Sequence, residues 1–134
     1  MINGKTNLVM GTIGVGYGPY AVAVNPPANR IYVANTYGNT VSVINGKTNL
    51  VTATIDVGNG TSGIAVNTKT NAVYVANTYG NTVSVINGKT NLVTETVYVG
   101  YGPYAVAANT KTNTEYVTNL NDSTVSVVSL AALW

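Results

Sequence analysis

The sequence predicts an all-β protein built from repeated units, and two observations carry that prediction. The string Ile-Asn-Gly-Lys-Thr-Asn-Leu begins at Ile2, Ile44 and Ile86, so successive copies of one unit lie 42 residues apart. Each unit holds short apolar stretches that alternate with polar residues or are rich in β-branched residues, separated by Asn- and Gly-rich turns. A repeat of roughly 40–50 residues with four short strands is typical of a β-propeller blade, so we expect three four-stranded blades.

The repeats account for nearly the whole chain of 134 residues. We assign them to residues 2–43, 44–85 and 86–127, and we expect blades over residues 1–128 and a non-repeat C-terminal tail at 129–134. Hydrophobic residues make up 46 % of the chain, which suffices for a buried core in a domain of this size. Charged residues make up only 7 %, so Asn, Thr, Ser and Gly carry most of the polar surface.

The first strand of the middle copy is predicted at residues 50–57, where apolar and polar side chains alternate. Val51, Ala53, Ile55 and Val57 share one face, and Thr and Asp side chains share the other. This period of two predicts a strand with one buried face.

Three further strands are predicted in the same copy. The segment 58–63 should form a turn because of its glycines. The run at 64–66 is wholly apolar and should be a strand buried on both faces, while β-branched residues at 72–76 and 82–86 predict two more strands. An Asn-Gly dipeptide then begins a hairpin. In blade order, these three strands would be the inner, second and third, and the alternating Thr-rich strand would be the outer one.

A short motif repeats within the second strand of each unit. The string Tyr-Val-Thr-Asn stands at 116–119, and Tyr-Val-Ala-Asn stands at 32–35 and 74–77. On these residues the chain resembles the YVTN β-propeller repeat family of archaeal and bacterial surface-layer proteins, over residues 2–127. The resemblance implies a propeller fold and a place on the cell surface or outside the cell. It implies no particular ligand, because the family is defined by its blade and not by a site.

Several classes of partner are not expected from the composition. The net charge is only +2, and nucleic acid would need a concentrated basic stripe, whereas the lysines are spread over separate turns at Lys5, Lys47, Lys69, Lys89 and Lys111. No apolar run approaches the roughly 18 residues of a membrane span, so we expect no membrane insertion. The first residues also lack the charged and apolar regions of a signal peptide.

The chain lacks the residue types that most enzymes use. It has no histidine and no cysteine, and its four acids, Asp56, Glu95, Glu115 and Asp122, are not paired along the sequence. We therefore expect no catalytic residues, no metal site and no cofactor. Seven-bladed lactonases and related oxidoreductases resemble this repeat at blade level, but a lactonase-like activity is disfavoured for the same reason. Glu95 and Glu115 replace apolar residues of other copies, and we expect both at the wetter rim of their blades.

The order of strands predicts that the chain associates with itself. Propellers typically have four to eight blades, so three blades would leave two open ends. The chain begins with an outer strand, Leu8 to Val15, and its last blade has no outer strand. Two chains in a homodimer would complete each other's last blade with this strand and close a six-bladed ring. A nine-bladed trimer, a larger or mixed assembly, an open fragment and another solenoid remain alternatives.

One face of the predicted propeller should carry tyrosine. The links between outer and inner strands and between second and third strands lie on the same face, and they hold Tyr17, Tyr20, Tyr37, Tyr79, Tyr101 and Tyr104. Asn35, Asn77 and Asn119 stand nearby in sequence. Together these side chains would suit an uncharged ligand such as a glycan or a peptide. Alternatively, the rings only pack over the blade ends and the asparagines close turns. The patch is uneven, because the middle copy has Asn59, Thr61 and Ser62 in place of Tyr, Pro and Tyr.

These observations favour a non-catalytic scaffold or adhesion module, similar to surface-layer repeat proteins. The alternative function is the binding of a glycan or peptide through the tyrosine-rich face. A ligand lost on replacement of Tyr20 or Tyr104 would favour the second function.

Overall fold

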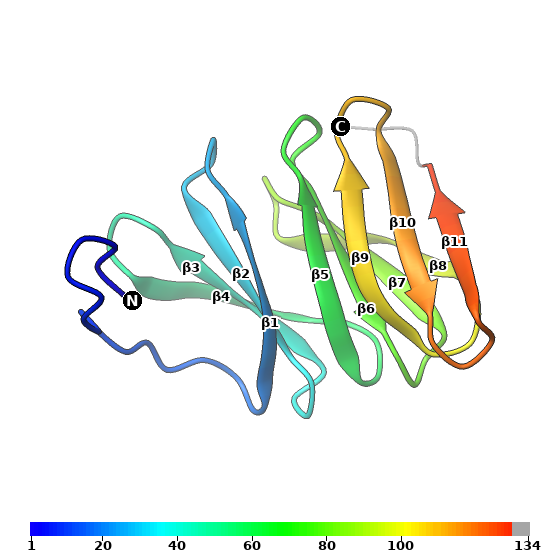
Figure 1. The fold of residues 1–134 in the computed structure, drawn as a ribbon, viewed down its shortest axis with the longest axis horizontal. Coiled ribbons are helices and arrows are strands. Elements are labelled where there is room, and N and C mark those ends of the chain that lie inside the picture. The colour runs from blue at the N-terminus through cyan, green and yellow to red at the C-terminus, as the bar shows by residue number, and fades with distance from the viewer. Residues whose placement is uncertain (130–134) are drawn as a thin grey trace.

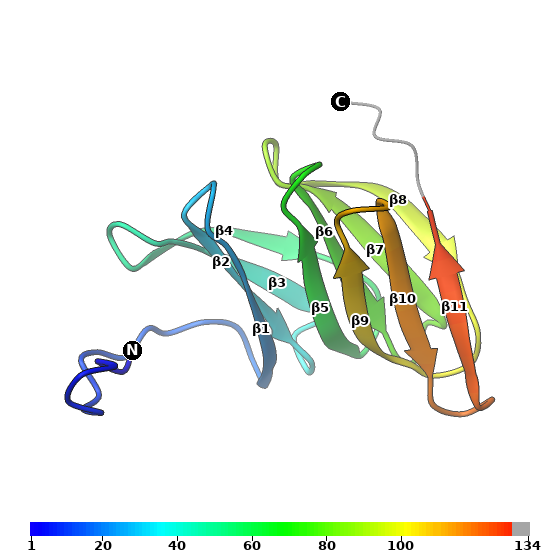
Figure 2. The same ribbon diagram turned by 45° about the horizontal axis from the view of Figure 1, so that its top comes forward.

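The computed structural model describes residues 1–129, and every regular element among them is a β-strand. Eleven strands form three separate antiparallel sheets, which stand side by side like an opened fan (Figure 1). Turning the molecule shows that the sheets splay around the side on which β1, β5 and β9 lie (Figure 2). Residues 130–134 of the predicted tail lie outside the described residues.

Each sheet is a simple meander in which consecutive strands pair. The first two sheets have four strands each, and the third has three within the described residues. The first sheet contains β1 (Pro19–Asn25), β2 (Arg30–Asn35), β3 (Thr40–Asn45) and β4 (Leu50–Asp56). The second contains β5 (Thr61–Asn67), β6 (Ala72–Asn77), β7 (Thr82–Asn87) and β8 (Leu92–Tyr98). The third contains β9 (Pro103–Asn109), β10 (Thr114–Asn119) and β11 (Thr124–Val128). This arrangement is consistent with three propeller blades, the last of which lacks its outer strand.

All four strands predicted for the middle repeat are present, but the inner strand differs in two ways. It begins at Thr61, inside the segment predicted as a turn. Gly63 lies in this strand because the neighbouring strand passes too close to leave room for a side chain, and not because the backbone turns there. A Cβ at Gly63 would lie 2.8 Å from the Cα of Ala105 in β9. The inner strand is also not buried on both faces, since Ala65 and Val66 are half-buried. An inner strand is the edge of its sheet, so nothing covers its side toward the centre of the fan.

The segment Leu8 to Val15, predicted as an outer strand that completes the last blade of a partner chain, forms no strand within the single chain. Only an isolated bridge between Ile2 and Val9 forms there, and the segment is otherwise irregular. The segment is equivalent in the repeat to β4 and β8, each of which pairs with a third strand of its own sheet. Residues 8–15 precede the first sheet, whose outer edge β4 already occupies, so the strand has no place to pair within the chain.

The turns explain why asparagine is so abundant. A residue with positive φ closes each hairpin turn of the described residues, and it is Asn in all but one: Asn7, Asn29, Asn39, Asn49, Asn71, Asn81, Asn91 and Asn113. Asparagine tolerates this left-handed conformation better than other residues with a Cβ. A second asparagine often opens the turn. For example, the Asn45 side-chain oxygen accepts hydrogen bonds from the amides of Lys47 (2.8 Å) and Thr48 (3.2 Å).

Ser123 is the one exception among the turn-closing residues, with φ at 57°. Asn39 and Asn81 hold the equivalent position in the other repeats. We expect Ser123→Asn to raise the free energy of unfolding by about 0.5 kcal/mol, because Asn adopts positive φ at lower cost than Ser. Thermal unfolding followed by circular dichroism measures this, with Ser129→Asn as the matched control. Equal stabilisation by both variants would contradict the backbone explanation.

The core lies between the sheets. Between the first and second sheets it includes Tyr32, Val41 and Val43 on one side and Val73 and Val75 on the other. An equivalent cluster joins the second and third sheets. Hydrogen bonds reinforce both junctions, because the Asn39 side chain accepts from the Gly60 amide (2.8 Å) and the Asn81 side chain accepts from the Gly102 amide (3.0 Å). Successive sheets are therefore joined by the same contacts.

Candidate functional site

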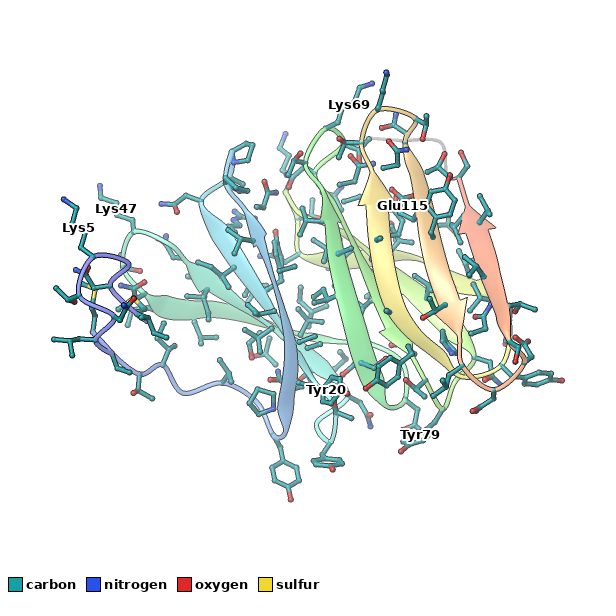
Figure 3. All side chains as sticks on the ribbon, viewed as in Figure 1. Lys5, Tyr20, Lys47, Lys69, Tyr79 and Glu115 are labelled. Carbon is teal, nitrogen blue, oxygen red and sulfur yellow. The ribbon has the colours of Figure 1, made fainter. Side chains whose placement is uncertain are left out.

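The tyrosines gather at one end of the fan, as predicted. Tyr20 and Tyr79 lie at the lower end in Figure 3, whereas Lys5, Lys47 and Lys69 lie toward the other end. All six predicted tyrosines, Tyr17, Tyr20, Tyr37, Tyr79, Tyr101 and Tyr104, are exposed. This end therefore presents aromatic rings to solvent without neighbouring lysines.

Glycines with positive φ let the chain pass beneath these rings. Gly18, Gly60 and Gly102 have φ of 70°, 69° and 65°. A Cβ at Gly18 would collide with the ring of Tyr37, and one at Gly60 with the ring of Tyr79. The Gly60 carbonyl also accepts a hydrogen bond of 2.9 Å from the Thr78 amide. The glycines thus hold each link against the turn that carries a tyrosine.

A pocket of about 300 Å³ opens between the rings. Its wall comes from all three sheets and comprises Gly18, Pro19, Tyr20, Thr36, Tyr37, Gly60, Ser62, Thr78, Tyr79 and Tyr104. Four of the six predicted tyrosines are thereby brought together. The volume lies at the lower end of the range for small-molecule sites.

The other two tyrosines lie outside the pocket wall. Tyr17 rests against Tyr37, with ring centroids 5.4 Å apart. Tyr101 has no such partner, because Asn121 stands where the earlier repeats have tyrosine. The Tyr101 amide instead donates a 2.9 Å hydrogen bond to Asp122. The hydrogen bond from the Thr124 hydroxyl, and then the one from the Tyr101 amide, hold the pKa of the Asp122 carboxyl below its ordinary value.

Three lining residues of the pocket, Thr36, Ser62 and Thr78, were not predicted as site residues. The Thr78 hydroxyl lies 2.8 Å from both the Ser62 hydroxyl and the Pro103 carbonyl and shares its one proton between these two acceptors, while Ser62 donates to the Tyr104 carbonyl at 2.9 Å. These bonds join β5 to β9 at the floor of the site. The equivalent Thr36 hydroxyl is buried and has no hydrogen-bond partner within residues 1–129. The departure of the middle repeat from its neighbours was the sequence signal for this region.

The three predicted asparagines are engaged inside their sheets. Asn35, Asn77 and Asn119 are buried, and each donates from its side-chain nitrogen to a Thr and a Ser of the adjacent strand. For Asn77 these distances are 3.1 Å to Thr82 and 2.9 Å to Ser84. The asparagines therefore support the links beneath the rings and contribute no group to the pocket wall.

We expect Asn77→Ala to destabilise the protein by about 1–3 kcal/mol, because it leaves two buried hydroxyls without their donor. Chemical denaturation monitored by circular dichroism measures the change. The exposed Asn59→Ala in the next link is the control and should change stability by less than about 0.5 kcal/mol. A near-neutral Asn77→Ala would show that this asparagine does not hold the sheet together.

The expectation that Glu115 lies at a wet rim is wrong, whereas Glu95 is exposed. Glu115 is 0 % exposed, because the second position of β10 faces the second sheet. Its carboxylate accepts a 3.0 Å hydrogen bond from Asn67 and another from the Tyr74 hydroxyl. Burial raises the pKa of Glu115, and these two hydrogen bonds only partly offset it. Burial, and then Glu115, raise the pKa of Tyr74 to about 12.

Glu115 lies apart from the pocket, and the titratable group beside it is the Tyr74 hydroxyl and not a second carboxylate, as far as residues 1–129 show. Within residues 1–129, no group of three or more His, Cys, Asp or Glu side chains gathers as a metal site would require. The same part of the chain contains no helix of the length and apolarity needed to cross a membrane.

Comparison with solved structures places the chain among β-propellers. No protein-family model and no curated protein sequence matches it. It is similar to a structure of hydrazine synthase from Kuenenia stuttgartiensis, with a TM-score of 0.80 and 21 % identity over 91 % of this chain and 36 % of that chain. It is also similar to the β-propeller domain of Cps50 (Swd1) from Myceliophteria thermophila, with a TM-score of 0.68 and 12 % identity over 91 % of this chain and 40 % of that one.

A third similar structure is a protein of unknown function from Desulfotomaculum acetoxidans, with a TM-score of 0.74 and 19 % identity over 96 % of this chain and 46 % of that one. The chain thus spans less than half the length of each of these three proteins. At these identities the similarity shows the fold alone. The all-β propeller fold predicted from the repeats is confirmed.

Proposed function

We propose that this chain is a non-catalytic propeller module of the YVTN surface-layer type, and that two copies close into a six-bladed ring that serves as a scaffold or adhesion unit. The observation that carries the proposal is the equivalence of the two free sheet faces to faces that are buried inside the chain. The residue chemistry of the two ends matches, so a second copy is the partner that fits them.

The free face of the first sheet displays Val22 and Val24. Val22 is 64 % exposed, whereas the equivalent Ile64 in the second sheet is 9 % exposed because the first sheet covers it. The free face of the third sheet displays Val125 and Val127, whose equivalents in the earlier sheets are fully buried. Each free face is therefore a copy of one half of an internal junction, and the two halves complement each other.

The N-terminal segment supports the same assembly. Leu8 to Val15 lacks a place to pair, and the outer edge of β11 lacks a partner among the described strands. If each chain donated this segment to β11 of the other, every sheet would have four strands. The unpaired edge of β11 would then be covered in both copies. A compact homodimer of this kind needs no contact that does not already occur within the chain.

Molar mass in solution, measured by light scattering on a sizing column, tests the ring. We expect twice the chain mass of 13.9 kDa. Three times that mass would favour a nine-bladed trimer, and a stable compact monomer would overturn the closure.

The second candidate function is glycan or peptide binding through the tyrosine face, and the pocket between the three sheets favours it. Its wall is aromatic and hydroxyl-bearing, which suits recognition better than chemistry. An enzymatic function of the lactonase type gains no support, since no carboxylate or cationic side chain lines this pocket.

A further inference from the structure

A single departure from the repeat lies at the wall of the pocket. Tyr20 in β1 and Tyr104 in β9 hold equivalent positions, and β5, which runs between those strands, has Ser62 there (Figure 1). The rings of Tyr20 and Tyr104 approach edge to face, with centroids 5.9 Å apart and planes at 80°. A tyrosine at position 62 would add a third ring to this region, whereas Ser62 adds none and is buried at the pocket wall, with 4 % of its surface exposed.

The wall of the pocket is apolar but rich in hydroxyls. Tyr37 and Tyr79 complete the aromatic part, and no lysine, arginine, aspartate or glutamate lines it. None of the four tyrosine hydroxyls in the wall makes a hydrogen bond within residues 1–129. A charged ligand would lose its hydration here without gaining an opposite charge, so the site discriminates against ions.

Thr36 adds a polar group that the protein itself leaves unused. The equivalent Thr78 has two acceptors at 2.8 Å, the Ser62 hydroxyl and the Pro103 carbonyl, whereas Thr36 has Tyr20 in place of the serine and bonds no carbonyl of the described residues. The Thr36 side-chain oxygen is consequently buried against the pocket without a partner in the described chain. Solvent does not reach this oxygen as the side chain stands, so a ligand hydroxyl would bond it only after a rotation about the Cα–Cβ bond that turns the Thr36 hydroxyl into the pocket.

From this arrangement we propose that the pocket binds one neutral pyranose ring, at a stoichiometry of one per chain. A pyranose has an apolar face of C–H groups for the tyrosine rings and hydroxyls at its edge for Thr36 and the tyrosine hydroxyls. A proline ring would match the aromatic walls but would leave the Thr36 hydroxyl unsatisfied. This inference rests on the proposal that the tyrosine face is a binding surface.

Isothermal titration of the full chain with maltose, cellobiose, lactose and chitobiose tests the inference, with digalacturonate and triproline as contrasting probes. We expect at least one neutral disaccharide to bind with one site per chain, and no binding of digalacturonate. Ser62→Tyr should reduce the affinity at least 10-fold, because it adds to this region a third ring of the kind found at positions 20 and 104.

Thr36→Val keeps the shape of the side chain and removes only its hydroxyl, so it serves if Ser62→Tyr folds poorly. It should weaken binding about 5- to 10-fold, whereas the exposed Tyr101→Ala outside the pocket should leave affinity unchanged. Equal affinity of the unchanged protein and Thr36→Val, or binding of triproline and no sugar, would overturn the inference. Light scattering on the same samples separates the two proposals: a dimer that binds no sugar overturns only the sugar site, and a monomer that binds sugar overturns only the ring.

Discussion

A Val22→Asp variant should run as a monomer in solution at concentrations at which the unchanged protein is a dimer. Val22 lies on the free face of the first sheet, and closure of the ring would bury it as Ile64 is buried at the internal junction. Burying an unpaired carboxylate at such a junction costs at least about 3 kcal/mol, which corresponds to a loss of more than 100-fold in association. Light scattering across a dilution series gives the dissociation constant.

The fold of the protomer should survive this change, because Val22 is already exposed in the single chain. Leu50→Asp is the matched control, since Leu50 is equally exposed but begins an outer strand away from both free faces. We expect the control to remain a dimer with an unchanged far-ultraviolet spectrum. A Val22→Asp variant that still dimerises would show that the free face of the first sheet is not part of the interface.

A Glu115→Val variant should be more stable than the unchanged protein at neutral pH, by about 1–3 kcal/mol. The second repeat shows the expected result of the change, because Val73 holds the equivalent position there and is fully buried. Asn67 would then turn to the side-chain oxygen of Asn113, as the equivalent Asn25 bonds Asn71 at 2.8 Å. The Tyr74 hydroxyl would lose its acceptor, as the equivalent Tyr32 hydroxyl has none among the described residues, and this loss moderates the gain.

The advantage of Glu115→Val should depend on pH in a defined direction. Because burial raises the pKa of Glu115 in the folded state, the folded protein binds this proton more tightly than the unfolded chain does. The contribution of Glu115 to stability is therefore complete below its unfolded pKa, near 4.5, and is lost as the pH rises through the folded pKa. Urea denaturation at pH 4 and pH 8 should show the variant gaining on the unchanged protein at the higher pH. The exposed Glu95→Val, as control, should show no such trend, and a pH-independent difference for Glu115→Val would contradict burial as the cause.

The repeat made most of the fold predictable, because the same short strands occur three times and a period of two identifies their buried faces. Tertiary context decided the exceptions. The glycines of segment 58–63 predicted a turn, but Gly63 lies in a strand, since the neighbouring β9 passes too close for a side chain. Leu8 to Val15 has the alternation of a strand but joins no sheet of the described chain, since β4 already occupies the outer edge of the first sheet.

The tyrosine cluster was also predictable, because the links that carry Tyr37 and Tyr79 and the strand starts that carry Tyr20 and Tyr104 lie at the same end of a meander. The asparagines next to it were not, since a side chain at the end of a strand can point to solvent or back into the sheet, and Asn77 does the latter. Thr36 was missed because the sequence does not show whether a threonine hydroxyl in this turn finds a partner: the equivalent Thr78 does and Thr36 does not. Glu115 was misplaced because a lone carboxylate among neutral residues is usually found at the surface.

The edge of β11, which is unpaired among the described strands, affects how the protein aggregates at high concentration. An unpaired strand edge accepts any extended segment, and the chain carries such a segment at its own N-terminal end. If the reciprocal exchange closes, the hazard disappears, and if one donation is made without its return, the same pairing propagates from chain to chain as a filament. Aggregation should therefore increase with the population of incompletely closed species. Because the donated strand would have to dissociate first, subunits should exchange between preformed rings far more slowly than the rings diffuse.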